Sequence, residues 1–283
     1  RTMYYDRSWA FCLSQNVLDS LPEGKYRAVI DSEHIDGSLT YSEAVFPGTS
    51  GKEVLFSTYV CHPSMCNDNL SSVAVKTKLA NYMSKKKNLK HTYRFVFLPE
   101  TIGAITWLSK NQKRLAKICA GVNLTCTGNR GPLTFKKSRQ EESLSDHAME
   151  RSLDDMGLDY NKTSFSPVGS DERQYCSPGI NLPVVTLMRT PPGEFEEYHT
   201  SADDLSAISS ESLDEVYEAC LGYIEILEKN YVYVNMYSKG EPQLGKRGLY
   251  RKVGGQRSNK VSQTAIKWVL NYSDGKHDLL DIS

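Results

Sequence analysis

Strand-like and helix-like segments alternate along most of this chain. From residue 51 onward, short runs of apolar and β-branched residues are followed by longer segments whose apolar residues recur at helical spacing. The predicted strands cover residues 53–60, 93–99, 119–128 and 182–189, and the predicted helices cover residues 69–87, 104–118, 143–158 and 212–231. Strands that alternate with helices pair in parallel, so this order predicts an α/β fold with a mostly parallel sheet and helices on both faces.

Two regions break the alternation. Residues 23–50 read as short strands around the turn Asp36–Gly37, which predicts a small inserted β domain. Residues 241–283 are first basic and glycine-rich and then helical, which predicts a separate C-terminal module. The chain begins at Arg1 rather than at a methionine, and we expect it to be a fragment that stops within this module.

Composition limits the partners and the compartment. The 34 basic residues equal the 34 acidic residues, so no overall charge favours nucleic acid or an anionic membrane as a partner. No apolar run reaches the roughly 18 residues of a membrane span. The seven cysteines form no CxxC pair and are expected to be free thiols in the cytoplasm.

Imidazole and carboxylate side chains come directly after the predicted strands. His62 and Asp68 follow the first strand, Glu100 follows the second, and Asp171 and His199 flank the last. The carboxyl ends of parallel strands meet at one edge, so these groups are expected to converge there. A catalytic zinc uses a few such ligands and keeps a position for water, while a further carboxylate acts as general base.

Other readings of the same stretch remain open. Each of these residues alone is more often an ordinary surface or capping residue, and Asp203 and Asp204 are expected to be caps before the following helix. Cys61 and Cys66 could form half of a structural zinc clip, but no second pair of cysteines lies near them in the sequence.

Several separated motifs resemble one bacterial family of aminopeptidase-like proteins. The family is related to the M28 zinc peptidases and is often found beside polysaccharide-biosynthesis genes. The motifs are CHPSMCNDNLSSVAV, PETIGAITWL, SDERQYCSPGINLPV and EYHTSADDL, with YYDRSWAFC and GEPQLGKRGLY near the ends. The resemblance implies a three-layer zinc-peptidase-like domain (1–22 and 51–240), a small inserted β domain (23–50) and a partial, truncated winged-helix-like domain (241–283).

The resemblance also implies roles for individual residues. Asp68 matches the metal-bridging aspartate of the M28 pattern, and His199 matches the last histidine ligand. Glu100 lies where M28 peptidases have a Glu-Glu pair, of which one member is the base and the other a ligand. Thr101 replaces the second glutamate, so Glu100 is either the base or a ligand.

Three further positions depart from or extend the pattern. The early ligand histidine aligns with Tyr59 or with His62, and we favour His62 because imidazole binds zinc. Thr125 stands where another aspartate ligand is usual. Asp171 resembles an aspartate near the substrate and could be recruited as a ligand. With so few ligands, we expect one zinc ion rather than two.

The leading hypothesis is therefore a zinc-dependent, aminopeptidase-like hydrolase of a peptide, aminoacyl or acyl-amide substrate. The predicted site has His62, Asp68 and His199 on the metal, Glu100 as general base, and Asp171, Arg173 and Tyr175 on the substrate side. The first alternative is a non-catalytic binding module that keeps the peptidase fold. The second is a DNA-binding regulator that uses the basic cluster of the C-terminal module (Lys246, Arg247, Arg251, Lys252, Arg257 and Lys260), although a protein partner is the likelier use of that module.

Overall fold

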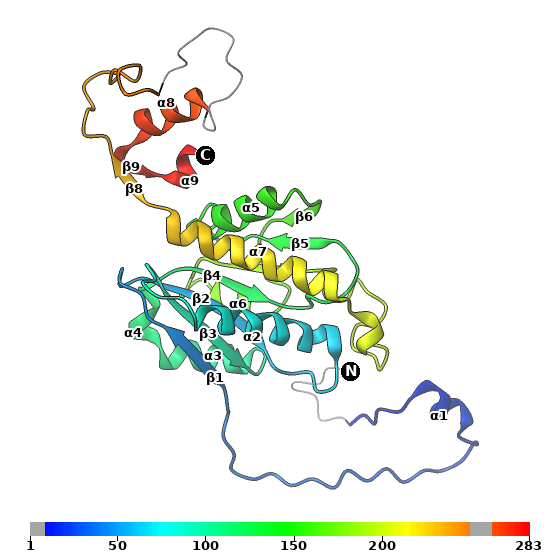
Figure 1. The fold of residues 1–283 in the computed structure, drawn as a ribbon. Coiled ribbons are helices and arrows are strands. Elements are labelled where there is room, and N and C mark those ends of the chain that lie inside the picture. Colours follow the sequence, from blue (N-terminus) through cyan, green and yellow to red (C-terminus); the bar gives the residue numbers. More distant parts are fainter. Residues whose placement is uncertain (1–8, 250–261) are drawn as a thin grey trace. The chain divides into compact units, whose positions relative to one another are not determined.

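The computed structural model describes residues 9–249 and 262–283. The chain divides into two units, residues 1–38 and 39–283, which are described separately. The first unit contains helix α1 (Gln15–Ser20) (Figure 1). Its N-cap residue is Ser14, whose hydroxyl accepts a hydrogen bond from the Val17 amide. The remaining elements belong to the second unit.

The second unit contains a seven-stranded sheet in the order β1-β3-β2-β4-β7-β5-β6. The four central strands β3, β2, β4 and β7 run parallel. Strand β1 is antiparallel to β3 and β5 is antiparallel to β7, whereas β6 runs parallel to β5. The strands are β1 (Ser42–Phe46), β2 (Glu53–Tyr59), β3 (Thr92–Leu98), β4 (Ile118–Leu124), β5 (Leu133–Lys136), β6 (Tyr160–Thr163) and β7 (Val184–Met188). The prediction of a mostly parallel sheet is confirmed, although the four-residue strands β5 and β6 were not predicted.

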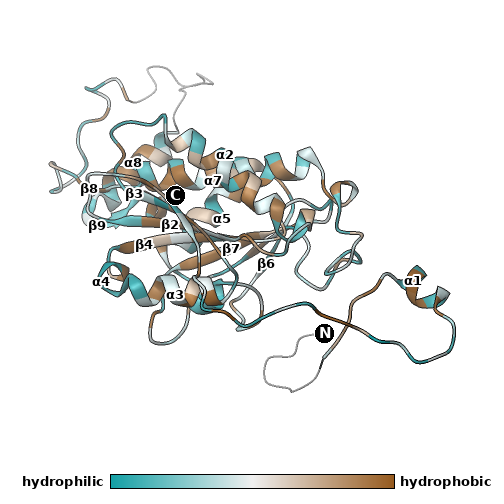
Figure 2. Ribbon diagram, turned by 90° about the horizontal axis from the view of Figure 1, so that it is seen from below, coloured by the Kyte–Doolittle hydropathy of each residue, from teal (hydrophilic) through white to brown (hydrophobic). Residues whose placement is uncertain are grey.

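Helices cover both faces of this sheet and complete the three predicted layers (Figures 1 and 2). Helices α2 (Ser71–Met83), α5 (Leu144–Met156) and α7 (Ser210–Lys229) pack on one face, where residues such as Phe56, Val122 and Leu187 form the larger core. Helices α3 (Ile102–Lys110), α4 (Gln112–Leu115) and α6 (Glu172–Tyr175) lie on the other, where Leu55 and Val96 contribute to a smaller core. Alternate residues of the central strands thus face different helical layers.

The short strands expected around Asp36–Gly37 are not formed. None of residues 23–41, all of which are described, belongs to a helix or strand, and nearly all of them are exposed. The strand that follows, β1, joins the edge of the main sheet by pairing with β3. The local pattern alone could not form a hairpin here, because a two-stranded hairpin without a packed face is at best marginally stable.

The C-terminal residues form a small β/α module. Strands β8 (Val232–Val234) and β9 (Asp274–Asp278) pair antiparallel, and helices α8 (Gln263–Tyr272) and α9 (Leu279–Ile282) accompany them. Of the basic cluster, Lys246 and Arg247 are exposed, and the positions from Arg251 to Lys260 lie outside the described residues. In the described parts of the chain, no helix is long and apolar enough to cross a membrane.

Candidate metal centre

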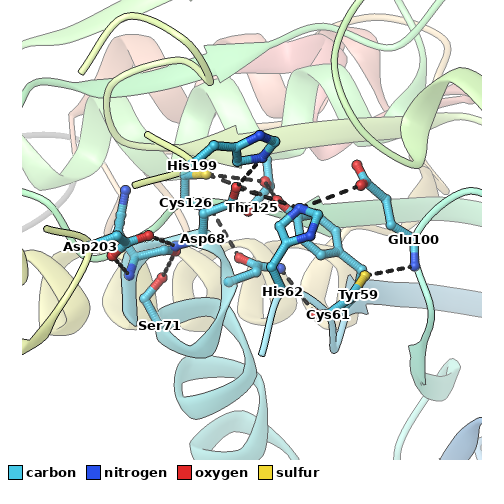
Figure 3. Close-up of polar contacts among 12 residues, drawn as sticks. Tyr59, Cys61, His62, Asp68, Ser71, Glu100, Thr125, Cys126, His199 and Asp203 are labelled. Carbon is cyan, nitrogen blue, oxygen red and sulfur yellow. Dashed lines mark hydrogen bonds and ion pairs between the residues drawn. The ribbon is translucent and has the colours of Figure 1, made fainter. Parts of the chain in front are cut away.

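The predicted ligands meet beyond the carboxyl ends of the central strands β3, β2 and β7, with β4 between β2 and β7. His62 follows β2, Glu100 follows β3, and His199 lies in the loop between β7 and α7. Asp68 comes from the irregular turn η1 (Cys66–Leu70), in which its backbone angles (φ −111°, ψ 77°) leave the helical range. That kink precedes α2, and Figure 3 shows the Asp68 carboxylate between the imidazoles of His62 and His199.

One oxygen of Asp68 faces both histidines. Its Oδ2 lies 3.1 Å from His199 Nε2 and 3.7 Å from His62 Nε2, and the three donor atoms lie within 4.8 Å of one another. Donors about 2.1 Å from a tetrahedral zinc ion are separated by about 3.4 Å, so this set fits one ion. Asp68 is buried, with 1% of its side chain exposed, whereas His199 is 48% exposed, which leaves access to the centre from solvent.

The other oxygen of Asp68 is already occupied by protein. The Tyr59 hydroxyl hydrogen-bonds to Asp68 Oδ1 and lies 2.8 Å from the Thr125 hydroxyl. Burial, followed by the nearby Cys126 and Asp68, holds the pKa of Tyr59 well above its ordinary value, so the phenol keeps its proton. Tyr59 and Thr125 thus form a hydrogen-bonded unit against Asp68.

Hydrogen bonds to residues far along the chain hold the loop that contains Asp68. Oδ1 of Asp203 accepts the amide of Asn67 at 2.5 Å, and Oδ2 accepts the amide of Asp68 at 2.9 Å. Asn67 Oδ1 in turn accepts the amides of Gly128 and Asn129, at 2.8 and 3.0 Å. Asn67 and Asn69, on either side of Asp68, thus accept backbone amides of the loop that follows β4, whereas the Asp68 carboxylate is held by Tyr59.

Glu100 lies at the rim of the centre, with 26% of its side chain exposed. Its Oε2 is 3.9 Å from His62 Nε2, and its backbone amide donates to Cys61 Sγ at 3.2 Å (Figure 3). Burial raises the pKa of Glu100, while the nearby His62 lowers it. Glu100 lies outside the three-donor cluster.

A strained residue adjoins Glu100. Thr101 has φ +60° and ψ −69°, an unusual conformation for a β-branched side chain. Its amide donates to Asp171 Oδ1 at 2.7 Å, so Asp171 holds this turn rather than joining the histidines. Burial raises the pKa of Asp171 to about 7, and its Oδ2 has no hydrogen-bond partner among the described residues.

The two remaining residues predicted on the substrate side, Arg173 and Tyr175, differ in their exposure to solvent. Arg173 is half-buried, donates from Nε to the Ser170 carbonyl at 2.9 Å, and lowers the pKa of both Glu100 and Asp171. Tyr175 is fully buried, 2.7 Å from the Ser57 hydroxyl and edge-on to Trp107. The short helix α6 turns Tyr175 into the smaller core, where the side chain has no access to solvent.

Two contributors were not predicted in their present roles. Asp203 was expected to cap the following helix, but it anchors the Asp68 loop from far along the chain, while Asp204 does cap the turn η2 (Leu205–Ala207). Tyr198 stacks on His199, with ring centroids 3.9 Å apart. All seven cysteines are free, as predicted, and no cysteine belongs to the ligand cluster found among the described residues.

Two family profiles match consecutive parts of the chain. A domain of unknown function, DUF4910, matches residues 15–230, and a winged helix-turn-helix profile matches residues 231–283. The second match begins at residue 231 rather than at the predicted residue 241, which includes β8 in the C-terminal module.

Two relatives from Clostridium acetobutylicum cover nearly the whole chain. One, named as a polysaccharide biosynthesis protein with an aminopeptidase-like domain, is 48% identical over 282 residues, which are 100% of this chain and 64% of that protein. The other is a crystal structure named as a peptidase, with a TM-score of 0.87 and 46% identity over 99% of this chain and 63% of its own. This chain thus spans less than two thirds of the length of these relatives.

A more distant structure shares the fold. The zinc aminopeptidase BSAP from Bacillus subtilis has a TM-score of 0.55 and 17% identity, over 66% of this chain and 48% of its own. At this identity the likeness concerns the fold, which is aminopeptidase-like.

Proposed function

We propose that this chain, which belongs to the DUF4910 family of aminopeptidase-like proteins, is a zinc-dependent hydrolase of amide bonds. The observation that carries the proposal is the position of Asp68 Oδ2 between His62 Nε2 and His199 Nε2. Two imidazoles and a carboxylate form a donor set that catalytic zinc prefers. The proposal concerns one ion, because Tyr59 occupies the second oxygen of Asp68.

Each residue of the centre has a distinct part in this proposal. His62, Asp68 and His199 would hold the ion. When bound, zinc lowers the pKa of a coordinated water and polarises a substrate carbonyl. Glu100 would accept the proton of the attacking water and pass it to the leaving amine, and its raised pKa suits a group that must release the proton again.

The surroundings of Glu100 support its role as the base. The Cys61 thiol accepts the Glu100 amide and Asp171 accepts the Thr101 amide, so the backbone is held on both sides of the carboxylate. Arg173 supplies a positive charge beside this carboxylate and can meet a carboxylate or another anionic group of the substrate. We also place the protein in the cytoplasm, which the seven free cysteines support.

The test combines metal analysis with turnover. We expect close to one zinc per chain and release of amine from aminoacyl or acyl amides, with turnover abolished by a chelator and restored by zinc. A folded protein that holds no zinc, or whose hydrolysis is unaffected by Glu100→Gln, would contradict the proposal.

A second candidate is a metal- or ligand-binding module without catalysis. The sequence basis for it is Thr101 and Thr125 at positions where the resemblance implies ligands. The observation that favours it is that the Thr125 hydroxyl is taken up by a contact of 2.8 Å with that of Tyr59. This candidate predicts bound zinc without turnover of any amide. The winged-helix module, which could contact a protein or DNA, would act independently of that outcome.

A further inference from the structure

A cavity of about 440 Å³ adjoins the metal centre. Thr125 and Tyr198 line it, and each also contacts the centre: Tyr198 stacks on His199, and the Thr125 hydroxyl lies 2.8 Å from that of Tyr59. Ser170, a third lining residue, lies close enough to Glu100 to lower its pKa. A group bound in this cavity would therefore be next to both the ion and the proposed base.

A row of polar side chains crosses the sheet beneath the cavity. Ser57 on β2 is paired with Asn123 on β4, Asn123 with Thr186 on β7, and Thr186 with Lys136 on β5. All four are buried, with at most 5% exposed. Such positions in a sheet covered on both faces are normally apolar, and a buried polar group costs free energy unless it is hydrogen-bonded.

Most of this row is satisfied by the protein. Ser57 is paired with Tyr175, and Glu172 accepts from Asn123 Nδ2 at 3.2 Å and from Lys136 Nζ at 2.9 Å. Lys136, Glu172 and Thr186 form the floor of the cavity. The opposite charges of the buried Lys136–Glu172 pair cancel, so this floor has no net charge. The other charged residue that lines the cavity, Glu194, is exposed, so the buried floor itself does not favour a charged group.

Two groups of the row have no hydrogen-bond partner among the described residues, Asn123 Oδ1 and the Thr186 hydroxyl, and of these two residues only Thr186 lines the cavity. Only 2% of the Thr186 side chain is exposed. Above this floor, the walls include apolar side chains and one aromatic ring, from Val168, Met188, Pro191, Pro192 and Tyr198. A ligand that presents hydroxyls to the floor and C–H groups to the walls would satisfy both surfaces.

We propose that this cavity binds a neutral, hydroxyl-rich ring, such as a sugar, on one side of the scissile amide. The inference rests on the proposed hydrolase for the position of that amide, but the subsite itself is defined by the polar row and the cavity. Thr186 donates to or accepts from a ring hydroxyl, and Tyr198 packs against the face of the ring.

The test separates sugar binding from hydrolysis. Binding of methyl β-D-glucopyranoside is measured by NMR titration for the native chain, Thr186→Val, Thr186→Ser and Thr134→Val. Thr134 is a matched control, because its buried hydroxyl is also unpartnered among the described residues but does not line the cavity. We expect Thr186→Val to raise Kd about 10-fold, with little change in the other two variants.

Turnover is compared in parallel for N-(L-alanyl)-D-glucosamine and L-alanyl cyclohexylamide, which share a ring size but differ in hydroxyls. We expect kcat/KM to favour the sugar amide by at least about 100-fold. Glucoside binding that depends on Thr186, without hydrolysis of either amide, would support the subsite and refute the hydrolase. Hydrolysis of both amides at similar rates, or no glucoside binding by the native chain, would overturn the subsite and leave the hydrolase intact.

Discussion

The Tyr59 hydroxyl binds one oxygen of Asp68, while the opposite oxygen lies 3.1 Å from His199 Nε2. One oxygen of the Asp68 carboxylate is therefore used in a hydrogen bond within the protein, and the other remains available to bind a metal ion. Groups that orient a metal ligand in this way commonly affect metal affinity, although they do not touch the ion. In the proposed one-ion centre, this use of the two oxygens distinguishes Asp68 from a carboxylate that bridges two ions.

Tyr59→Phe should weaken zinc binding by about 10- to 100-fold without changing the stoichiometry, because Asp68 loses the donor that orients it. Competition with a chromophoric chelator measures this affinity. Tyr93→Phe is the matched control: Tyr93 is equally buried and donates to Glu228 at 3.0 Å, away from the centre. Equal losses in both variants would indicate a general effect of removing a buried hydroxyl.

Zinc should stabilise the folded chain through the histidines. At a free zinc concentration 100 times Kd, the free energy of unfolding should rise by about 2.7 kcal/mol. The increase should be largely lost in His199→Ala and retained in His147→Ala, since His147 pairs with Glu142 on the surface. Thermal denaturation with and without zinc measures the effect, and an unchanged increase in His199→Ala would exclude His199 as a ligand.

Glu100→Gln should distinguish a base from a ligand. If Glu100 is the base, kcat falls by about 10²- to 10⁴-fold while zinc affinity stays unchanged. If it is a ligand, zinc affinity falls as well. Glu218→Gln, at an exposed position of α7, serves as the control for the loss of one negative charge.

The contribution of Asp171 to stability should depend on pH. Its pKa is raised to about 7 by burial, so between pH of about 4 and 7 the unfolded chain loses this proton while the folded chain keeps it. The free energy of unfolding is therefore not reduced by this group at low pH. As pH rises towards 7, the group lowers the free energy of unfolding, and the loss reaches about 4 kcal/mol. Asp171→Asn should therefore gain stability over the native chain across this interval, as urea denaturation would show. A difference independent of pH would contradict this pKa.

Lys76→Met should stabilise the chain. Lys76 is fully buried on α2, its ammonium contacts the Phe56 and Val96 carbonyls and lies 3.9 Å from the centre of the Phe97 ring, and burial lowers its pKa well below the ordinary value. The unfolded chain binds the Lys76 proton more tightly than the folded chain does. Burial of Lys76 therefore lowers the free energy of unfolding at pH 7, and this loss disappears as pH rises towards 10. We expect a gain of about 1–3 kcal/mol at pH 7, measured by urea denaturation. Lys78→Met, on the exposed side of the same helix, should change stability by less than about 0.5 kcal/mol.

The central architecture was predictable because its signals are local. The strands β2, β3, β4 and β7 and the helices α2, α5 and α7 each carry their own period of apolar residues. The short strands β5 and β6 have only four residues each, too few for such a signal, and β1 is a strand because β3 provides a partner.

The sequence by itself determined the layered α/β fold and the position of His62, Asp68, Glu100 and His199 near strand ends. Only the tertiary structure decided that Asp68 is shared between Tyr59 and the histidines, that Asp203 anchors its loop, and that Tyr175 is buried in the core. The reason is physical: periodic burial is encoded over a few neighbouring residues, whereas a hydrogen bond between distant loops depends on how the whole sheet and its covering helices pack.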